Sequence, residues 1–73
     1  MENKINELGF TKEKKDVFRK GYDNFVATLV YYEEVNAFDL SAYRLSETRY
    51  DAVTLREEIS FDDVKIFDNL FKY

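Results

Sequence analysis

Three pairs of adjacent carboxylates are the side chains of this sequence best suited to acid–base chemistry: Glu33-Glu34, Glu57-Glu58 and Asp62-Asp63. Acid–base catalysis and glycoside hydrolysis need two carboxylates held across a substrate cleft. Neighbouring residues of a helix project about 100° apart, so a helical segment would split each pair between two faces. A chain of 73 residues also has little room for a cleft. We therefore expect a protein that is not an enzyme.

The other groups that usually carry chemistry are missing from the sequence. It contains no His and no Cys, so the common nucleophile–base pairs and the usual zinc ligand sets lack their residues. Neither the spacing of a calcium-binding loop nor a glycine-rich phosphate loop occurs. We expect no catalytic residue, no metal and no cofactor.

Size and composition indicate one small domain, residues 1–73, with an aromatic core. A chain this short buries a modest fraction of its surface, and without Cys it gains no disulfide. Seven Phe and six Tyr make 18% of the chain aromatic. Each aromatic side chain can bury roughly 150–250 Å². The core must come from these side chains or from self-association, which makes a homodimer one alternative.

Charge is divided unevenly along the chain, whose formal net charge is −4. Residues 1–20 carry six basic and four acidic residues, a local charge of +2, whereas residues 21–73 carry five basic and eleven acidic residues, a local charge of −6. Phosphate binding needs clustered Lys and Arg, so direct binding of nucleic acid is disfavoured. An acidic surface is instead complementary to a basic one, and we expect a partner protein with a basic surface.

The sequence also predicts a cytoplasmic location without membrane contact. No apolar run approaches the roughly 18–20 residues of a membrane span. The segment Met1-Glu2-Asn3-Lys4 lacks the apolar stretch of a signal peptide. A chain without Cys fits a reducing compartment.

An apolar stripe at helical spacing runs through the first half of the chain. Its members are separated by 4, 3, 4 and 3 residues: Phe18, Tyr22, Phe25, Leu29 and Tyr32. This spacing places all five on one side of a helix and predicts a main helix from about Lys12 to Ala37. The same 4-3-4-3 spacing also suits a short dimer seam. Gly21 interrupts the stripe and predicts a bend, a break or a close approach of another helix.

Residues 25–32 carry a competing signal, because Phe, Val, Thr, Leu and Tyr in that run favour a β-strand. The chain has no Pro and only two Gly, and turns for a hairpin are hard to find in it. The period of the stripe therefore favours a helix here, and a strand is the alternative.

Shorter helices are expected on either side of the main helix. A short helix over residues 3–8 would end at Gly9, with Phe10 packing back on Ile5. A second helix would begin near Ser41 or near Thr48, where Thr48 and Asp51 resemble a capping box. A last helix would run from Phe61 to about Lys72, capped by Ser60 and Asp63, with an apolar side that the following residues form: Val64, Phe67, Leu70 and Phe71. The predicted fold is all-α, a small three-helix bundle with a short extra N-terminal helical turn; the alternative is α+β with residues 25–32 as a strand.

A surface of Tyr and acidic side chains is the clearest candidate binding site. If residues 43–58 are helical, most of its members share the outer face of the second helix, and two lie on the outer side of the main helix. The candidate partner-binding residues are Tyr31, Glu34, Tyr43, Glu47, Tyr50, Asp51, Thr54, Glu57 and Glu58. Tyr is favoured at protein interfaces, and acids between the Tyr residues would attract a basic partner.

The sequence therefore predicts a non-catalytic protein-binding module that acts as an inhibitor or adaptor on a basic partner surface, including one that normally binds nucleic acid. Two alternatives stand beside it. One is a small DNA-binding transcriptional regulator that uses the basic segment 12–20. The other is a self-associating structural subunit whose aromatic faces are buried between copies.

Overall fold

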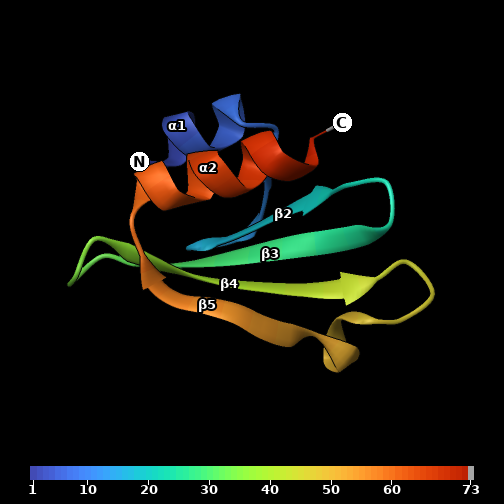
Figure 1. Ribbon diagram of the computed structural model, residues 1–73. Coiled ribbons are helices and arrows are strands. Elements are labelled where there is room, and N and C mark those ends of the chain that lie inside the picture. The colour runs from blue at the N-terminus through green and yellow to red at the C-terminus, as the bar shows by residue number, and fades with distance from the viewer. Residues whose placement is uncertain (73) are drawn as a thin grey trace.

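Five antiparallel strands and two helices make up the fold in the computed structural model, which describes residues 1–72 (Figure 1). The elements in chain order are α1 (Glu2–Glu7), β1 (Thr11–Lys14), β2 (Val17–Gly21), β3 (Phe25–Tyr32), β4 (Ala37–Arg44), the single 3-10 turn η1 (Arg49–Asp51), β5 (Val53–Ile59) and α2 (Phe61–Phe71). The strands follow one another in the sheet in the order β1-β2-β3-β4-β5. Both helices lie on the same face of the sheet, which we call the covered face (Figure 1). We call the opposite face of the sheet the open face.

The prediction of an all-α three-helix bundle is wrong, because the segment assigned to the main helix forms β1, β2 and β3. The alternative α+β interpretation is partly matched, since residues 25–32 coincide with β3. The propensity of this run for a strand is realised because β3 pairs along its length with β4 and over five residues with β2. These neighbours supply the ladder hydrogen bonds and packing that a lone segment lacks.

The apolar stripe misleads because its even steps fit a strand as well as a helix. Phe18 and Tyr22 are four residues apart, as are Phe25 and Leu29, and in a strand such residues point to the same face. The odd step from Tyr22 to Phe25 passes through the turn at residues 23–24, where the chain reverses. The final odd step places Tyr32 on the open face, where 40% of it is exposed.

The hairpins use Asp and Asn rather than Gly in their turns. Asp16, between β1 and β2, has φ 63°, and Asn36, between β3 and β4, has φ 51°. Asp and Asn tolerate this left-handed conformation better than other residues with a side chain. Neither position has the Gly that commonly marks a hairpin turn, so the sequence did not predict a hairpin at either one. Gly21 neither bends a helix nor admits a neighbour: it ends β2, with nothing within 4 Å of a Cβ added there.

The predicted second helix is also wrong, since residues 41–59 form the second half of β4, then η1 and β5. The capping box of Thr48 and Asp51 exists, with the Thr48 N–H donating to Asp51 Oδ2 over 2.9 Å. It opens only the three-residue η1. A cap satisfies the first turn of a helix but does not supply an apolar face for further turns.

The two terminal helices are confirmed. The α1 helix ends in a Schellman motif: Gly9 has φ 95°, and the Phe10 N–H donates to the Ile5 carbonyl over 3.4 Å. The α2 helix begins at the Ser60–Asp63 capping box, as predicted. Its apolar side is different from the expected one, because Leu70 is 71% exposed and Phe71 44% exposed.

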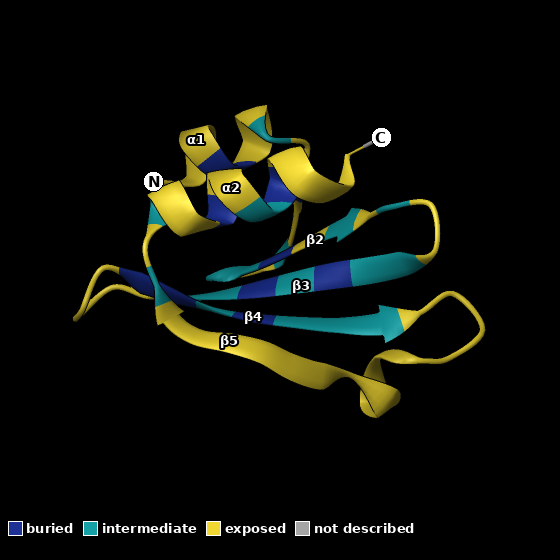
Figure 2. Cartoon of the chain, viewed as in Figure 1, coloured by how far each residue is buried: buried dark blue, intermediate teal, exposed yellow. Residues whose placement is uncertain are grey.

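The core lies between the two helices and the covered face of β2, β3 and β4 (Figure 2). Its buried members are Ile5, Phe10, Phe18, Ala27, Leu29, Phe38, Leu40 and Val64. Cross-strand neighbours form the centre of the core, since Leu29 lies opposite Phe18 on one side and Leu40 on the other. Strand β5 is exposed along nearly its whole length (Figure 2). No helix within residues 1–72 is long and apolar enough to cross a membrane.

Candidate protein-binding surfaces

Acidic side chains from several segments gather at one end of the molecule, which we call the acidic end. It comprises Glu33, Glu34, Asp39, Glu57, Glu58, Asp62 and Asp63. The turn between β3 and β4, the start of β4, the end of β5 and the first turn of α2 all lie there (Figure 1). The antiparallel register requires this arrangement, because Phe38 near the start of β4 lies opposite Ile59 at the end of β5.

Local hydrogen bonds hold the acidic end without neutralising it. Asp39 Oδ1 accepts from the Glu58 N–H over 3.0 Å, and Glu58 has a left-handed φ of 52° at an irregularity of the ladder. Asp63 accepts from Ser60 in the capping box of α2. Within the described part of the chain, none of the seven carboxylates forms an ion pair. The acidic end therefore presents negative charge to solvent.

The negative charge of the acidic end affects the pKa of Tyr32, which lies on the open face. The Asp39 carboxylate raises the pKa of the Tyr32 hydroxyl, with smaller contributions from partial desolvation, a hydrogen bond to Asp39 and the charge of Glu57. Negative neighbours disfavour the phenolate, which accounts for the direction. Tyr32 is thus a neutral hydrogen-bonding group in an acidic setting, and its exposed ring offers apolar contact area.

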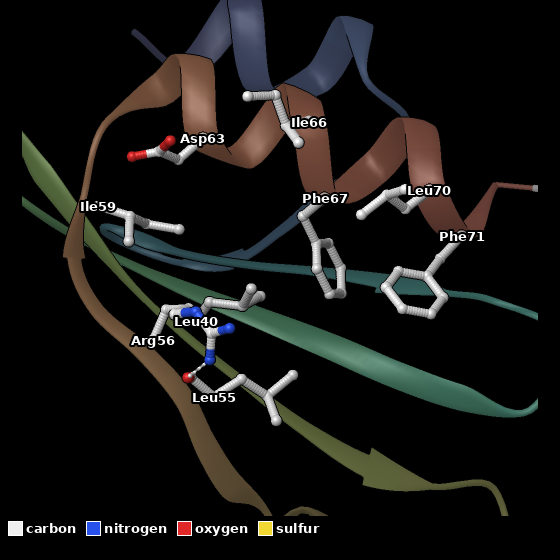
Figure 3. A pocket seen from close by; sticks show the side chains of 9 residues that line it. All are labelled: Leu40, Leu55, Arg56, Ile59, Asp63, Ile66, Phe67, Leu70 and Phe71. Atoms are coloured by element: carbon white, nitrogen blue, oxygen red, sulfur yellow. Dashed lines mark hydrogen bonds between the residues drawn. The ribbon is translucent and has the colours of Figure 1, made fainter.

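A second feature is an apolar groove between α2 and the β4–β5 edge, with a volume of about 650 Å³ (Figure 3). We call it the α2–β5 groove. Its lining residues are Leu40, Leu55, Arg56, Ile59, Asp63, Ile66, Phe67, Leu70 and Phe71. Asp63 belongs to the acidic end, so the groove opens onto that end. The Arg56 guanidinium donates to the Leu55 carbonyl over 2.7 Å instead of pairing with an acid.

The groove exists because two helices do not cover five strands. Neighbouring strands lie about 4.8 Å apart and packed helices 8–10 Å apart, so α1 and α2 together span about four strands. The fifth strand, β5, has no helix above it (Figure 1). The side chains of Leu55, on β5, and of Phe67 and Phe71, on α2, border the resulting space (Figure 3).

A buried charged contact fixes α2 on the sheet. Asp68 is 4% exposed, and its Oδ1 accepts from Lys20 Nζ over 2.6 Å and from the Tyr22 hydroxyl over 2.7 Å. Lys20 Nζ also donates to the Leu8 carbonyl, after α1. Burial, with the hydrogen bond to Asp68 and its charge, raises the pKa of Tyr22 well above its usual range. One network thus joins β2, α2 and the end of α1.

The predicted binding residues do not share a single surface. The outer helical face that was expected to unite them does not exist, because residues 43–58 are not helical. Tyr31 lies on the covered face, packs against Phe38 with ring centroids 4.9 Å apart, and donates to Asn36. Glu34 occupies the turn after β3, at the acidic end.

The remaining predicted residues divide between two ends of a molecule that measures 33 Å along its longest axis. Glu57 and Glu58 belong to the acidic end, and Thr54 lies near the start of β5. The others lie at the far end of the sheet, on the end of β4, in the loop after it and on η1: Tyr43, Glu47, Tyr50 and Asp51. Tyr50 is 92% exposed, and the Asp51 carboxylate accepts from the N–H of Thr48, the N-cap of η1.

The predicted binding residues did not include four members of the acidic end: Glu33, Asp39, Asp62 and Asp63. Asp62 and Asp63 were considered as a carboxylate pair and Asp63 as part of a helix cap, but neither was assigned to a binding surface, and Asp39 was given no role. The signal that could have found Asp39 is the alternation of Phe38, Asp39 and Leu40, which is typical of a half-buried strand. The groove had no sequence signal, because it results from the number of strands relative to the number of helices.

Two of the five basic residues in segment 12–20 are engaged within the domain, whereas Lys14, Lys15 and Arg19 are exposed. Lys12 pairs with Glu2 over 3.2 Å, and Lys20 pairs with the buried Asp68. Among residues 1–72, no group of three or more His, Cys, Asp or Glu side chains is arranged to hold a metal ion. Comparisons with models of known protein families, with curated proteins and with solved structures found no match to this chain.

Proposed function

We propose that this chain is a non-catalytic, cytoplasmic protein-binding domain that acts as an inhibitor or adaptor by docking its acidic end on a basic surface of another protein. The observation that supports the proposal is the convergence of seven carboxylates from three separate stretches of chain, none of them in an ion pair within residues 1–72. Repulsion among like charges destabilises the free fold, and a cationic partner removes that cost.

The physical mechanism is electrostatic complementarity. Opposite potentials on two surfaces accelerate their encounter and disfavour wrong partners, and both effects weaken as salt rises. If the partner normally binds nucleic acid, the carboxylates occupy the positions of phosphates. Tyr32, exposed beside Asp39, adds apolar contact area at the edge of the charged surface.

The test is a pull-down from the native cell lysate with the tagged full chain, at low and at high salt, read by mass spectrometry. We expect a dominant basic partner at low salt that is lost at high salt. Glu57→Lys should abolish its capture, whereas Asp23→Lys, an equal charge change in the exposed β2–β3 turn, should not. Equal capture by both variants, or a partner without a basic surface, would refute the proposal.

DNA binding through segment 12–20 is the weaker alternative, because Lys12 and Lys20 already have carboxylate partners within the domain. A gel-shift titration at low salt separates the two proposals. A shift that Lys14→Glu abolishes, while Glu57→Lys leaves it intact, would favour the DNA-binding regulator.

A further inference from the structure

The α2–β5 groove concentrates exposed apolar surface in one place. Of the ten large hydrophobic residues exposed within residues 1–72, four line it: Leu55, Ile66, Leu70 and Phe71. On the α2 side, Ile66 is 59% and Leu70 71% exposed. Large contiguous apolar patches on soluble proteins commonly mark sites where another molecule binds. The groove is therefore a candidate docking site, and its chemistry decides what occupies it.

An added β-strand is a poor occupant, although β5 is an edge strand. The register between β4 and β5 shifts twice, between Phe38 and Leu40 and between Leu40 and Ser41. The Arg56 guanidinium also engages the Leu55 carbonyl. Irregular register and charged side chains are the devices by which edge strands resist pairing. The space beside α2 and above β5 is instead where a third helix would complete the helical layer.

The charge around the groove specifies that helix further. Asp63 lines the groove, and Asp62, Glu57 and Glu58 lie at the same end. A helix seated there needs an apolar stripe for the groove and basic side chains toward this end. A second copy of this chain meets the requirement badly, because its one long helix, α2, carries Asp62 and Asp63 in its first turn, and the chain as a whole has net charge −4.

We propose that the α2–β5 groove binds an amphipathic helix of a basic partner protein. The helix packs an apolar stripe on Leu55, Phe67 and Leu70 and directs Lys or Arg side chains to Asp63 and its acidic neighbours. The 11 residues of α2 form one wall, so a docked helix of about three turns spans the groove. This proposal rests on the proposed function, since it assigns a structure to the part of the basic partner that makes contact.

The test uses two labelled synthetic peptides of about 18 residues that share one Leu stripe at helical spacing. One carries Lys on its polar flanks and the other Glu. Fluorescence anisotropy measures their binding to the full chain and to Ile66→Gln/Leu70→Gln. Gln keeps helix propensity at these exposed positions. The control variant is Leu45→Gln, because Leu45 is as exposed as Ile66, 59% each, but lies outside the groove.

We expect the Lys peptide to bind at least tenfold more tightly than the Glu peptide. The double Gln variant should weaken Lys-peptide binding by about tenfold or more, because losing one buried apolar contact raises the dissociation constant by about that factor. Leu45→Gln should leave the affinity unchanged. Circular dichroism of each protein variant checks that the fold is retained.

Four outcomes would overturn the proposal, and they separate it from the proposed function. If the Lys peptide binds the double Gln variant normally but does not bind Glu57→Lys, the groove is not the binding site, and the proposal of a basic partner stands. Equal binding of both peptides would refute the claim that the groove selects a basic helix. Failure of both peptides to bind would refute helix binding by the groove. The proposed function would then be tested by the pull-down alone. A dimer in sedimentation that the double Gln variant dissociates would assign the groove to a second copy.

Discussion

The contact between Asp68, Lys20 and Tyr22 is the residue-scale feature with the largest expected effect on stability. A buried carboxylate stays charged only with compensating partners, and Asp68 has an ammonium at 2.6 Å and a hydroxyl at 2.7 Å. Asp68→Asn would leave the Lys20 charge, mostly buried, without its counter-ion. We expect a loss of about 3 kcal/mol in the free energy of unfolding, measured by urea denaturation. Asp23→Asn, at an exposed turn, should change it by less than about 0.5 kcal/mol.

Tyr22 makes the stability of the fold depend on alkaline pH. Its pKa in the folded protein is raised above that of an unfolded Tyr, which is about 10. Below pH 10 the hydroxyl is protonated in both states, so its contribution is fully present. Above pH 10 the unfolded chain releases this proton and the folded chain does not, so stability falls as pH rises. The urea midpoint should fall less steeply between pH 10 and 11.5 in Tyr22→Phe than in the original chain. Identical slopes would contradict this assignment.

The two glycines of the chain should respond oppositely to substitution by Ala. Gly21 ends a strand with open space around an added Cβ, so Gly21→Ala should stabilise the fold by about 0.5–1 kcal/mol by restricting the unfolded chain. Gly9 has φ 95°, and its Cβ would lie 3.1 Å from Lys20 Nζ. Gly9→Ala should therefore destabilise it by more than about 1 kcal/mol. Thermal unfolding of both variants checks the pair, and a loss of stability in Gly21→Ala would refute the first half.

At the scale of elements, the sequence predicts those whose signals are local and fails where pairing decides. The Gly9 stop of α1 and the Ser60–Asp63 cap of α2 depend on neighbouring residues only, and both helices form where expected. The central segment could not be assigned by spacing. Steps of four suit a helix and a strand equally, and the turn at residues 23–24 absorbs the odd step between Tyr22 and Phe25. Its β propensity was visible, but the pairing with β2 and β4 that realises it was not.

The candidate sites depend on the same distinction between local and distant residues. The pairs Glu33-Glu34 and Glu57-Glu58 are adjacent in sequence and were singled out from it, but nothing local places the two pairs at one end. That follows from the antiparallel order of β3, β4 and β5. Conversely, Tyr50 was grouped with Glu57 on a helical face, and η1 places it at the far end. Part of the predicted acidic surface exists, since Glu34, Glu57 and Glu58 lie together, but it lies at the acidic end and not on a helical face.

At the scale of the whole molecule, the acidic end should cost the free protein stability. Its carboxylates repel one another without an ion pair among residues 1–72 to offset them. Glu57→Lys should relieve the repulsion and stabilise the isolated fold slightly, by less than about 1 kcal/mol at low salt. The gain should shrink when salt screens the charges, since the Debye length falls from about 30 Å at 0.01 M to about 3 Å at 1 M.

Urea denaturation of Glu57→Lys at low and at high salt measures this effect, with Asp23→Lys as the equal charge change at the other end of the sheet. A loss of stability in Glu57→Lys, or a gain that high salt leaves unchanged, would show that the carboxylates are not in electrostatic conflict. The same variant is expected to lose the basic partner in the pull-down. A substitution that stabilises the fold while abolishing capture is typical of a charge kept for binding at a cost to stability. Failed capture could then not be attributed to a damaged fold.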